Sequence, residues 1–145
     1  MRSVLTIDDA KKNSIINYYD NSVVEKMMMI FFKIKDAKYV VQEIIKPNRD
    51  EYKYIEKKLS GVKGSFMIKA INVCIKNKYD GMILVHNHRE KLIPLLSSTD
   101  RMANEKIKNY FKSKSINLLF GSGVYANKKI TYLLENKYKI AQSLR

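Results

Sequence analysis

Six consecutive apolar residues, Met27 to Phe32, constrain the fold of this 145-residue chain more than any other feature. A strand with one side in water alternates apolar and polar residues, whereas an unbroken apolar run is typical of a strand buried on both faces. A second short run, Met82 to Val85, ends directly at a histidine. Both runs indicate strands in the interior of a β-sheet that is covered on its two sides.

Helical and strand patterns alternate along the rest of the chain. We expect helices from Asp8 or Asp9 to Asp20 and over residues 66–78, 99–112 and 138–144, and further strands over 39–45, 116–120 and 129–134. The expected N-caps are Ser65 and either Ser97 or Ser98. We expect turns at residues 36–38 and 121–123, and a short helix or an irregular exposed stretch over residues 51–59. The sequence therefore predicts an α/β fold, a single domain over residues 1–145 with a mixed β-sheet sandwiched by helices.

Composition limits the class of protein. The hydrophobic fraction of 46% fits a globular fold, and the single cysteine, Cys74, lies among apolar neighbours and excludes an internal disulfide. We expect its thiol to be buried and inert. No stretch is long and apolar enough to span a membrane, and acidic Asp8 and Asp9 stand where a signal peptide needs apolar residues. These features predict a cytoplasmic protein.

The charge is strongly positive and uneven. Lys and Arg total 28 against 14 Asp and Glu, a formal net charge of +14, and residues 101–145 alone carry 10 basic and 2 acidic side chains. Such a surface can attract nucleic acid or an acidic protein. A lysine-rich solvated surface explains the same numbers, so the sequence leaves both interpretations open.

The chain's two histidines, His86 and His88, and the nearby Asp100 form a candidate metal site. In an extended strand, residues two apart point to the same side, so the two imidazoles can converge on one ion. Two histidines and a carboxylate can bind zinc and leave its fourth position open, as catalytic sites do. On spacing alone, however, an exposed turn followed by an ordinary capped helix start remains an equal alternative.

The runs His86-Asn87-His88 and Ser97-Ser98-Thr99-Asp100 resemble the JAMM motif of the JAB/MPN zinc metallopeptidases, especially the short prokaryotic and RadC-like members. An apolar strand precedes the runs and a helix follows, as the motif requires. The resemblance covers roughly residues 20–135 and implies the layered fold that this family shares with cytidine deaminases.

The chain departs from the family pattern in the loop between the ligands. Arg89 and Leu96 stand where the family often has proline, and eleven residues rather than the usual ten or so separate His88 from Asp100. We expect the ligands to survive and this loop to differ. Arg89 and Lys91 are either substrate contacts or, more simply, solvated loop residues.

The resemblance assigns a role to each site residue. It implies that His86, His88 and Asp100 bind Zn²⁺, and that Ser97 donates a hydrogen bond to the oxyanion formed during hydrolysis. The family's general base is a glutamate on the first core strand. Glu25, directly before the run Met27–Phe32, fits this place better than Glu43 in the second strand.

The implied activity is amide hydrolysis by a zinc peptidase or isopeptidase. The expected substrate is the C-terminal tail of a ubiquitin-like or otherwise conjugated protein, removed from lysine in a bacterial conjugation system of the kind that acts in anti-phage defence. Two alternatives stay open. The chain can be a RadC-like basic protein associated with nucleic acid, or a non-catalytic scaffold with this fold.

Overall fold

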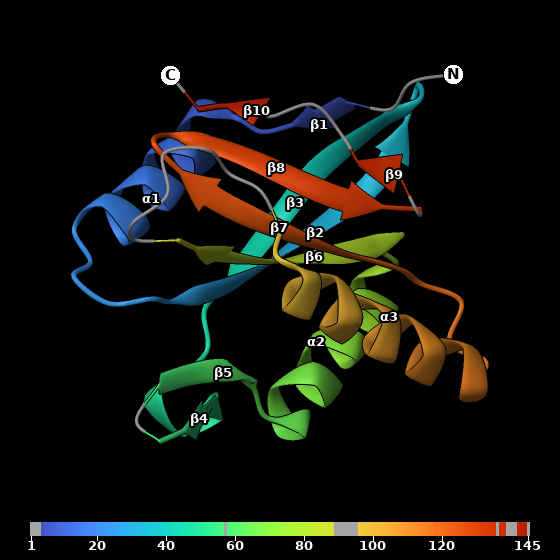
Figure 1. Cartoon of the computed structure of the whole chain (residues 1–145). Coiled ribbons are helices and arrows are strands. Elements are labelled where there is room, and N and C mark those ends of the chain that lie inside the picture. The colour runs from blue at the N-terminus through green and yellow to red at the C-terminus, as the bar shows by residue number, and fades with distance from the viewer. Residues whose placement is uncertain (1–3, 57, 89–95, 136, 139–141, 145) are drawn as a thin grey trace.

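A curled mixed β-sheet forms the centre of the computed structural model, which describes residues 4–56, 58–88, 96–135, 137–138 and 142–144 (Figure 1). Its strand order is β1-β3-β2-β6-β7-β8-β10, and β9 pairs with β8. The strands are β1 (Val4–Thr6), β2 (Met27–Lys35), β3 (Lys38–Ile45), β6 (Gly81–Asn87), β7 (Leu119–Ala126), β8 (Lys129–Leu134), β9 (Lys137–Tyr138) and β10 (Gln142–Ser143). The β1–β3 and β6–β7 pairs are parallel and the other pairs are antiparallel, so the predicted α/β class with a mixed sheet is confirmed.

Strand β2 lies inside the sheet, between β3 and β6. Its residues from Met28 to Phe32 are fully buried, as the unbroken apolar run predicts. The chain returns into β3 through Asp36 and Ala37, which both have positive φ, 50° and 62°. Two left-handed residues make the tight turn whose twist matches that of a β-hairpin.

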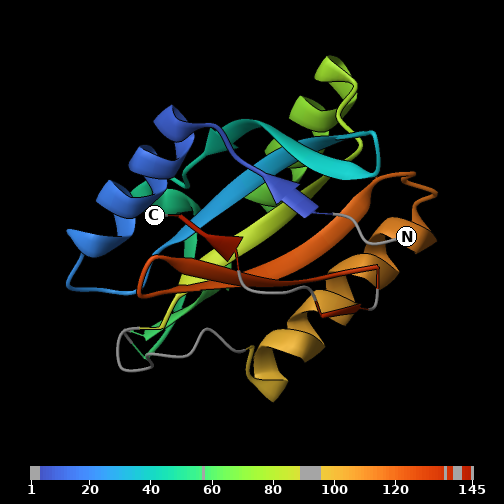
Figure 2. The ribbon, with the colours of Figure 1, turned by 90° about the horizontal axis from the view of Figure 1, so that it is seen from above.

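Three helices cover the two faces of the sheet: α1 (Asp9–Asp20), α2 (Gly64–Asn77) and α3 (Ser98–Ser113). Alternate residues of β2 point to opposite faces, so Met28 packs in the cluster that contains α1 and Met29 in the cluster that contains α2 and α3. Figure 2 shows α1 and α3 on opposite sides of the sheet. The predicted sandwich is therefore present.

Most of the described part of residues 51–59, expected to be a short helix or an irregular exposed stretch, belongs to a β-hairpin. After a 3-10 turn (Arg49–Glu51), strands β4 (Tyr52–Ile55) and β5 (Lys58–Val62) pair antiparallel to each other, apart from the main sheet and beside the start of α2 (Figure 1). Tyr54 and Ile55 are exposed, which removes the buried alternation by which a strand is recognised. The reversal uses Glu56 with a positive φ of 50°, without the Gly or Asn that signals a turn.

Two other expectations are wrong near the C-terminus. The glycines at 121 and 123 are not a turn but lie inside β7. Strand β8 approaches so closely that a Cβ at Gly121 would lie 2.5 Å from the carbonyl oxygen of Leu133, so glycine is needed here for packing and not for a turn. The expected helix over 138–144 is absent from its described part, where β9 and β10 pair with β8 instead. Pairing to a sheet edge overrides the local helical pattern there.

The remaining predictions concern caps, the thiol and the membrane. Lys63, not Ser65, occupies the N-cap position of α2, and it makes no side-chain cap. Cys74 is buried, and burial raises the pKa of its thiol to about 12, which fits the expected inert role. Among the helices of the described residues, none combines the length and apolar character needed to cross a membrane.

Candidate metal centre

The two histidines lie at the carboxyl end of β6, in the middle of the sheet. His86 pairs with Met27 of β2 on one side and with Val124 of β7 on the other. The backbone N–H of His88 donates to the carbonyl of Tyr125 at 3.4 Å, which keeps the chain aligned with β7 for one residue more. This extended backbone places both imidazoles on the same side of the sheet.

The carboxylate comes from the first turn of α3. Ser97 is the N-cap, and its Oγ accepts the backbone N–H of Asp100 at 3.1 Å. Asp100 Oδ2 in turn accepts the backbone N–H of Ser97 at 2.9 Å, which closes a reciprocal capping box. The predicted cap is confirmed, and it fixes the orientation of the carboxylate.

The three candidate ligand atoms form a small triangle. Nε2 of His86 and Nε2 of His88 are 2.9 Å apart, and Asp100 Oδ2 lies 3.3 Å from the first and 3.4 Å from the second. A tetrahedral zinc ion with bonds of about 2.0–2.1 Å holds its ligand atoms about 3.3 Å apart. Within the described ranges this is the one group of three metal-ligating side chains that converge. The set fits zinc, although imidazole and carboxylate also suit other divalent metals.

The environment keeps Asp100 ionised. Burial raises the pKa of this carboxyl, but hydrogen bonding and attraction to His86, with hydrogen bonds from Ser97, hold it well below its usual range. The three side chains are 11%, 14% and 21% exposed, in the order His86, His88 and Asp100, so an ion or a small substrate group can reach them. The site therefore combines one carboxylate charge with two imidazole rings.

Glu25, the predicted base, lies in the exposed segment just before β2. Its neighbours on both sides are bonded to Asn87, the residue between the two histidines. The backbone N–H of Lys26 donates to Asn87 Oδ1 at 2.7 Å, and Asn87 Nδ2 donates to the carbonyl of Val24 at 3.3 Å. Glu25 thus stands beside the end of β6 that carries the ligands.

Glu43, the other candidate base, lies much farther along the sheet. It pairs with Phe31, and Phe31 pairs with Met82, four residues before His86. Four residues of strand span about 13 Å. The Glu43 carboxylate accepts a hydrogen bond from the hydroxyl of Tyr79 at 2.7 Å, a structural role. The placement of the two glutamates favours Glu25 as the site residue.

Two cavities flank the triangle. The first, of about 280 Å³, includes His86 and Asp100 and opens between the β4–β5 hairpin and α3. Its other lining residues are mainly apolar or small, with two lysines: Met27, Lys53, Ser60, Gly61, Val62, Gly64, Met67, Leu84, Thr99, Ala103, Asn104, Lys106, Ile107 and Ser122. The second, of about 330 Å³, is more polar and is lined by Tyr19, Asp20, Ser22, Val23, Asn87, His88, Tyr125, Ala126 and Asn127. The two cavities therefore open beside different ligands of the triangle, one beside His86 and Asp100 and the other beside His88.

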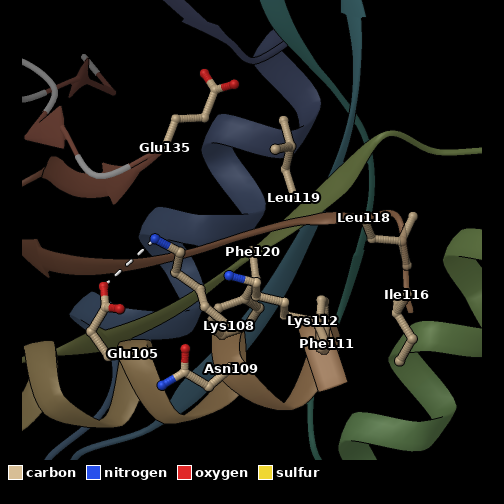
Figure 3. A pocket seen from close by; sticks show the side chains of 10 residues that line it. All are labelled: Glu105, Lys108, Asn109, Phe111, Lys112, Ile116, Leu118, Leu119, Phe120 and Glu135. Carbon is tan, nitrogen blue, oxygen red and sulfur yellow. Dashed lines mark ion pairs between the residues drawn. The ribbon is translucent and has the colours of Figure 1, made fainter. Parts of the chain in front are cut away.

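A larger cavity of about 470 Å³ lies elsewhere, between α3 and the start of β7. Figure 3 shows Lys108 directed toward Glu105 along the helix, an ion pair with 3.6 Å between the charged atoms, and Glu135 across the hollow. None of the candidate metal ligands lines it. Its size alone gives it no chemistry, so the smaller cavities beside the triangle are the candidates for substrate.

The sequence predicts the three residues of the triangle, but no motif singles out Asn87, Lys53 or Lys106, which also lie at or beside the site. The period-two alternation of a strand would have placed Asn87 opposite the histidines, where a buried amide needs hydrogen-bond partners. The two lysines carry no local signal, because only the fold brings both to the lining of one cavity. Arg89 and Lys91, considered as substrate contacts, lie outside the described residues.

Comparisons with known proteins support the fold and go no further. No protein-family model matches the chain, and no curated protein matches it. Among solved structures, the chain is similar to the solution structure of protein DSY2949 from Desulfitobacterium hafniense, with a TM-score of 0.56 and 9% sequence identity. The match covers 96% of this chain and 90% of that chain. At this identity the likeness shows a shared fold alone.

Proposed function

We propose that this protein is a zinc-dependent peptidase that hydrolyses an amide bond, with the isopeptide bond of a conjugated protein tail as its substrate class. The observation that carries the proposal is the triangle of His86, His88 and Asp100, whose ligand-atom separations of 2.9, 3.3 and 3.4 Å fit a tetrahedral ion. Three protein ligands leave one position for the reaction, as in catalytic zinc sites. The resemblance of these residues to the JAMM motif supports the same activity.

The chain's own side chains account for the proton transfers. A zinc ion, when bound, supplies Lewis-acid polarisation and activation of water. Glu25 accepts a proton from the attacking water and returns it to the leaving nitrogen. The carbonyl carbon gains a C–O bond and loses its C–N bond, and the products are a carboxylic acid and an amine. Ser97 keeps its proton and donates a hydrogen bond from its hydroxyl to the oxyanion, while its Oγ still accepts the N–H of Asp100.

The cavities beside the triangle support a chain-like substrate. The apolar cavity next to His86 suits an aliphatic side chain, and Lys53 and Lys106 on its lining suit a nearby carboxylate. The polar cavity next to His88 suits the amine side of the bond. Its carboxylate, Asp20, accepts a hydrogen bond from the Tyr125 hydroxyl at 2.6 Å and lies 3.8 Å from Lys128 Nζ, so its charge is already balanced within the protein. The proposed cellular role is removal of a ubiquitin-like or similar protein in a bacterial conjugation system.

Zinc analysis combined with an isopeptide cleavage assay tests the proposal. The purified protein should contain about one zinc per chain and should cleave a member of a panel of branched peptides, each a tail joined to lysine Nε. Glu25→Gln should keep its zinc and lose at least about 10²-fold in rate. Glu43→Gln is the matched control, because it removes an equivalent charge far from the triangle, and it should stay active.

Cleavage by Glu25→Gln at the wild-type rate, or protein that folds but takes up no metal, would refute the proposal. The metal-free outcome would favour the non-catalytic scaffold. The alternative of a basic nucleic-acid-associated protein rests on the net charge of +14. It predicts DNA or RNA binding that weakens steeply with salt but exceeds that of a similarly basic unrelated protein.

A further inference from the structure

Asn87 lies between the two histidines and is 6% exposed. An amide this deeply buried destabilises the fold if its hydrogen bonds are left unmade. Asn87 uses both ends of its amide. Its Oδ1 accepts from the N–H of Lys26 at 2.7 Å, and its Nδ2 donates to the carbonyl of Val24 at 3.3 Å.

These two bonds enclose a single residue, Glu25. Regular pairing between β2 and β6 stops at Met27 and His86. Beyond that point the side chain of Asn87 supplies the acceptor and the donor that a neighbouring strand would otherwise supply. The Asn87 amide therefore continues the β2–β6 pairing past Met27 and holds the backbone on both sides of Glu25 against the end of β6.

A second group of contacts fixes Met27, the first residue of β2, which follows directly after Lys26. The backbone N–H of Met27 donates to the Tyr52 hydroxyl at 3.0 Å, and the Met27 carbonyl accepts from Tyr18 at 2.9 Å. The two hydroxyls are themselves 2.9 Å apart. Glu25 is exposed, so its position depends on how firmly its backbone is anchored rather than on packing of its side chain.

We propose that Asn87 is the positioning residue for the catalytic base Glu25. This inference rests on the proposed function. Asn87 belongs to the same strand as both histidines, so one residue ties the base to the ligands and sets the distance between them. It acts through the backbone of the segment 24–26 and takes no part in the proton transfers.

The first test needs no catalysis. In the wild type, the Lys26 amide should be protected from hydrogen exchange, and in Co²⁺-loaded protein the Glu25 amide should show one sharp pseudocontact-shifted signal. Asn87→Ala should lower Lys26 protection at least tenfold and broaden or shrink the Glu25 shift, while metal content stays at one per chain. Asn87→Asp keeps the acceptor for Lys26 but loses the donor to Val24. It should give an intermediate result and serves if the alanine variant fails to fold.

The second test is a double-mutant cycle on the branched peptide that the wild type cleaves best. Asn87→Ala should lower kcat by about 10²-fold with little change in KM, since a displaced catalytic group loses this much. In the Glu25→Gln background the same change should have no further effect, because Asn87 acts only through Glu25. A merely structural role would lower activity in both backgrounds.

An Asn87→Ala effect of full size in the Glu25→Gln background, or unchanged Lys26 protection, would overturn the inference. The proposed function fails in a different way. A wild type that binds Co²⁺ but cleaves no peptide, while Asn87→Ala still displaces the Glu25 signal, would refute the peptidase and leave the anchoring by Asn87 intact. Failure of the wild type to bind Co²⁺ would refute the role of Glu25, and that of Asn87 with it.

Discussion

Ser97 caps α3, and in the proposed function the same side chain also donates a hydrogen bond to the substrate. Its Oγ accepts the N–H of Asp100 and so caps α3, and the same hydroxyl can still donate one hydrogen bond to a substrate oxygen. Substitution by alanine or by glycine can tell the two roles apart, because the two changes differ in their effect on stability. An N-cap serine replaced by alanine costs about 1 kcal/mol of stability, whereas replacement by glycine costs only a few tenths.

Ser97→Ala should therefore lower the free energy of unfolding by about 1 kcal/mol and lower kcat by about 10²–10³-fold. Ser97→Gly is the matched control, with nearly wild-type stability and the same loss in rate. Urea unfolding and cleavage of the branched peptide measure the two effects. If Ser97→Gly cleaves at the wild-type rate, the hydroxyl is not a catalytic donor.

Tyr19 connects α1 to the strand that carries the ligands, since its hydroxyl donates to the carbonyl of Val85 at 2.7 Å. Burial, with smaller contributions from neighbouring tyrosines, raises the pKa of its phenol well above the ordinary value of 10.0. The unfolded chain therefore loses this proton at a lower pH than the folded protein does. The stability that the protonated phenol contributes is present below pH ~10 and is lost as the pH rises above it.

Tyr19→Phe should reduce the free energy of unfolding at pH 7 by about 1 kcal/mol, the net value of one hydrogen bond. Above pH ~10 the free energy of unfolding should fall less steeply with pH in the variant than in the wild type, and the two slopes should differ by up to about 1.4 kcal/mol per pH unit. Urea unfolding at a series of pH values measures both effects. The exposed Tyr110→Phe is the control. Parallel pH profiles for wild type and Tyr19→Phe would contradict this account.

At the scale of elements, sequence predicted best where the local pattern and the burial agree. The run Met27–Phe32 lies in β2 and is buried from Met28 onward, and α1 begins at Asp9 with Asp8 as its cap, within the predicted limits. The β4–β5 hairpin escaped prediction because Tyr54 and Ile55 are exposed, so no alternation marked the strands. β10 escaped because its partner, β8, is a tertiary neighbour that no local pattern reveals.

In the candidate site, too, local patterns are predictable from the sequence and contacts between distant segments are not. His86, His88 and Asp100 are predictable because they lie within fifteen residues, on one strand end and one helix start. Placing Glu25 required the resemblance, since its contact with this region is made across the sheet through Asn87. Long-range pairings of this kind depend on register, which sequence pattern fixes weakly at the end of a strand.

The glycines of β7 allow a direct test of why that segment is a strand. A Cβ at Gly121 would lie 2.5 Å from a backbone oxygen of β8, which cannot move without disturbing the sheet. Gly121→Ala should lower the free energy of unfolding by about 1–3 kcal/mol. Gly64→Ala, in the first turn of α2 with open space around it, should instead be neutral or raise stability by up to about 1 kcal/mol. Urea midpoints that change equally in both variants would show that close strand packing at Gly121 is not the cause.

At the scale of the whole molecule, metal binding should raise the stability of the fold. A ligand that binds only the folded state at 100 times its Kd adds about 2.7 kcal/mol to the free energy of unfolding. For a chain of this size that corresponds to a rise in Tm of roughly 5–10 °C. Differential scanning calorimetry with and without zinc measures it, and EDTA should reverse it. Asp100→Asn should show a much smaller rise, and an equal rise in that variant would place zinc elsewhere.

The three candidate ligands come from two different elements, so an ion bound there would affect which part of the molecule opens first. Two come from the central strand β6 and one from the first turn of α3, so a bound ion is a cross-link between a helix and the middle of the sheet. Removing it should release the start of α3 before any strand separates, since local opening begins where the fewest anchors remain. Hydrogen exchange in the first turn of α3 should then respond to chelation while the amides of β2 do not. Because Thr99, Asp100 and Ala103 at the start of α3 line the cavity of about 280 Å³, a bound ion would also hold one wall of that cavity in place.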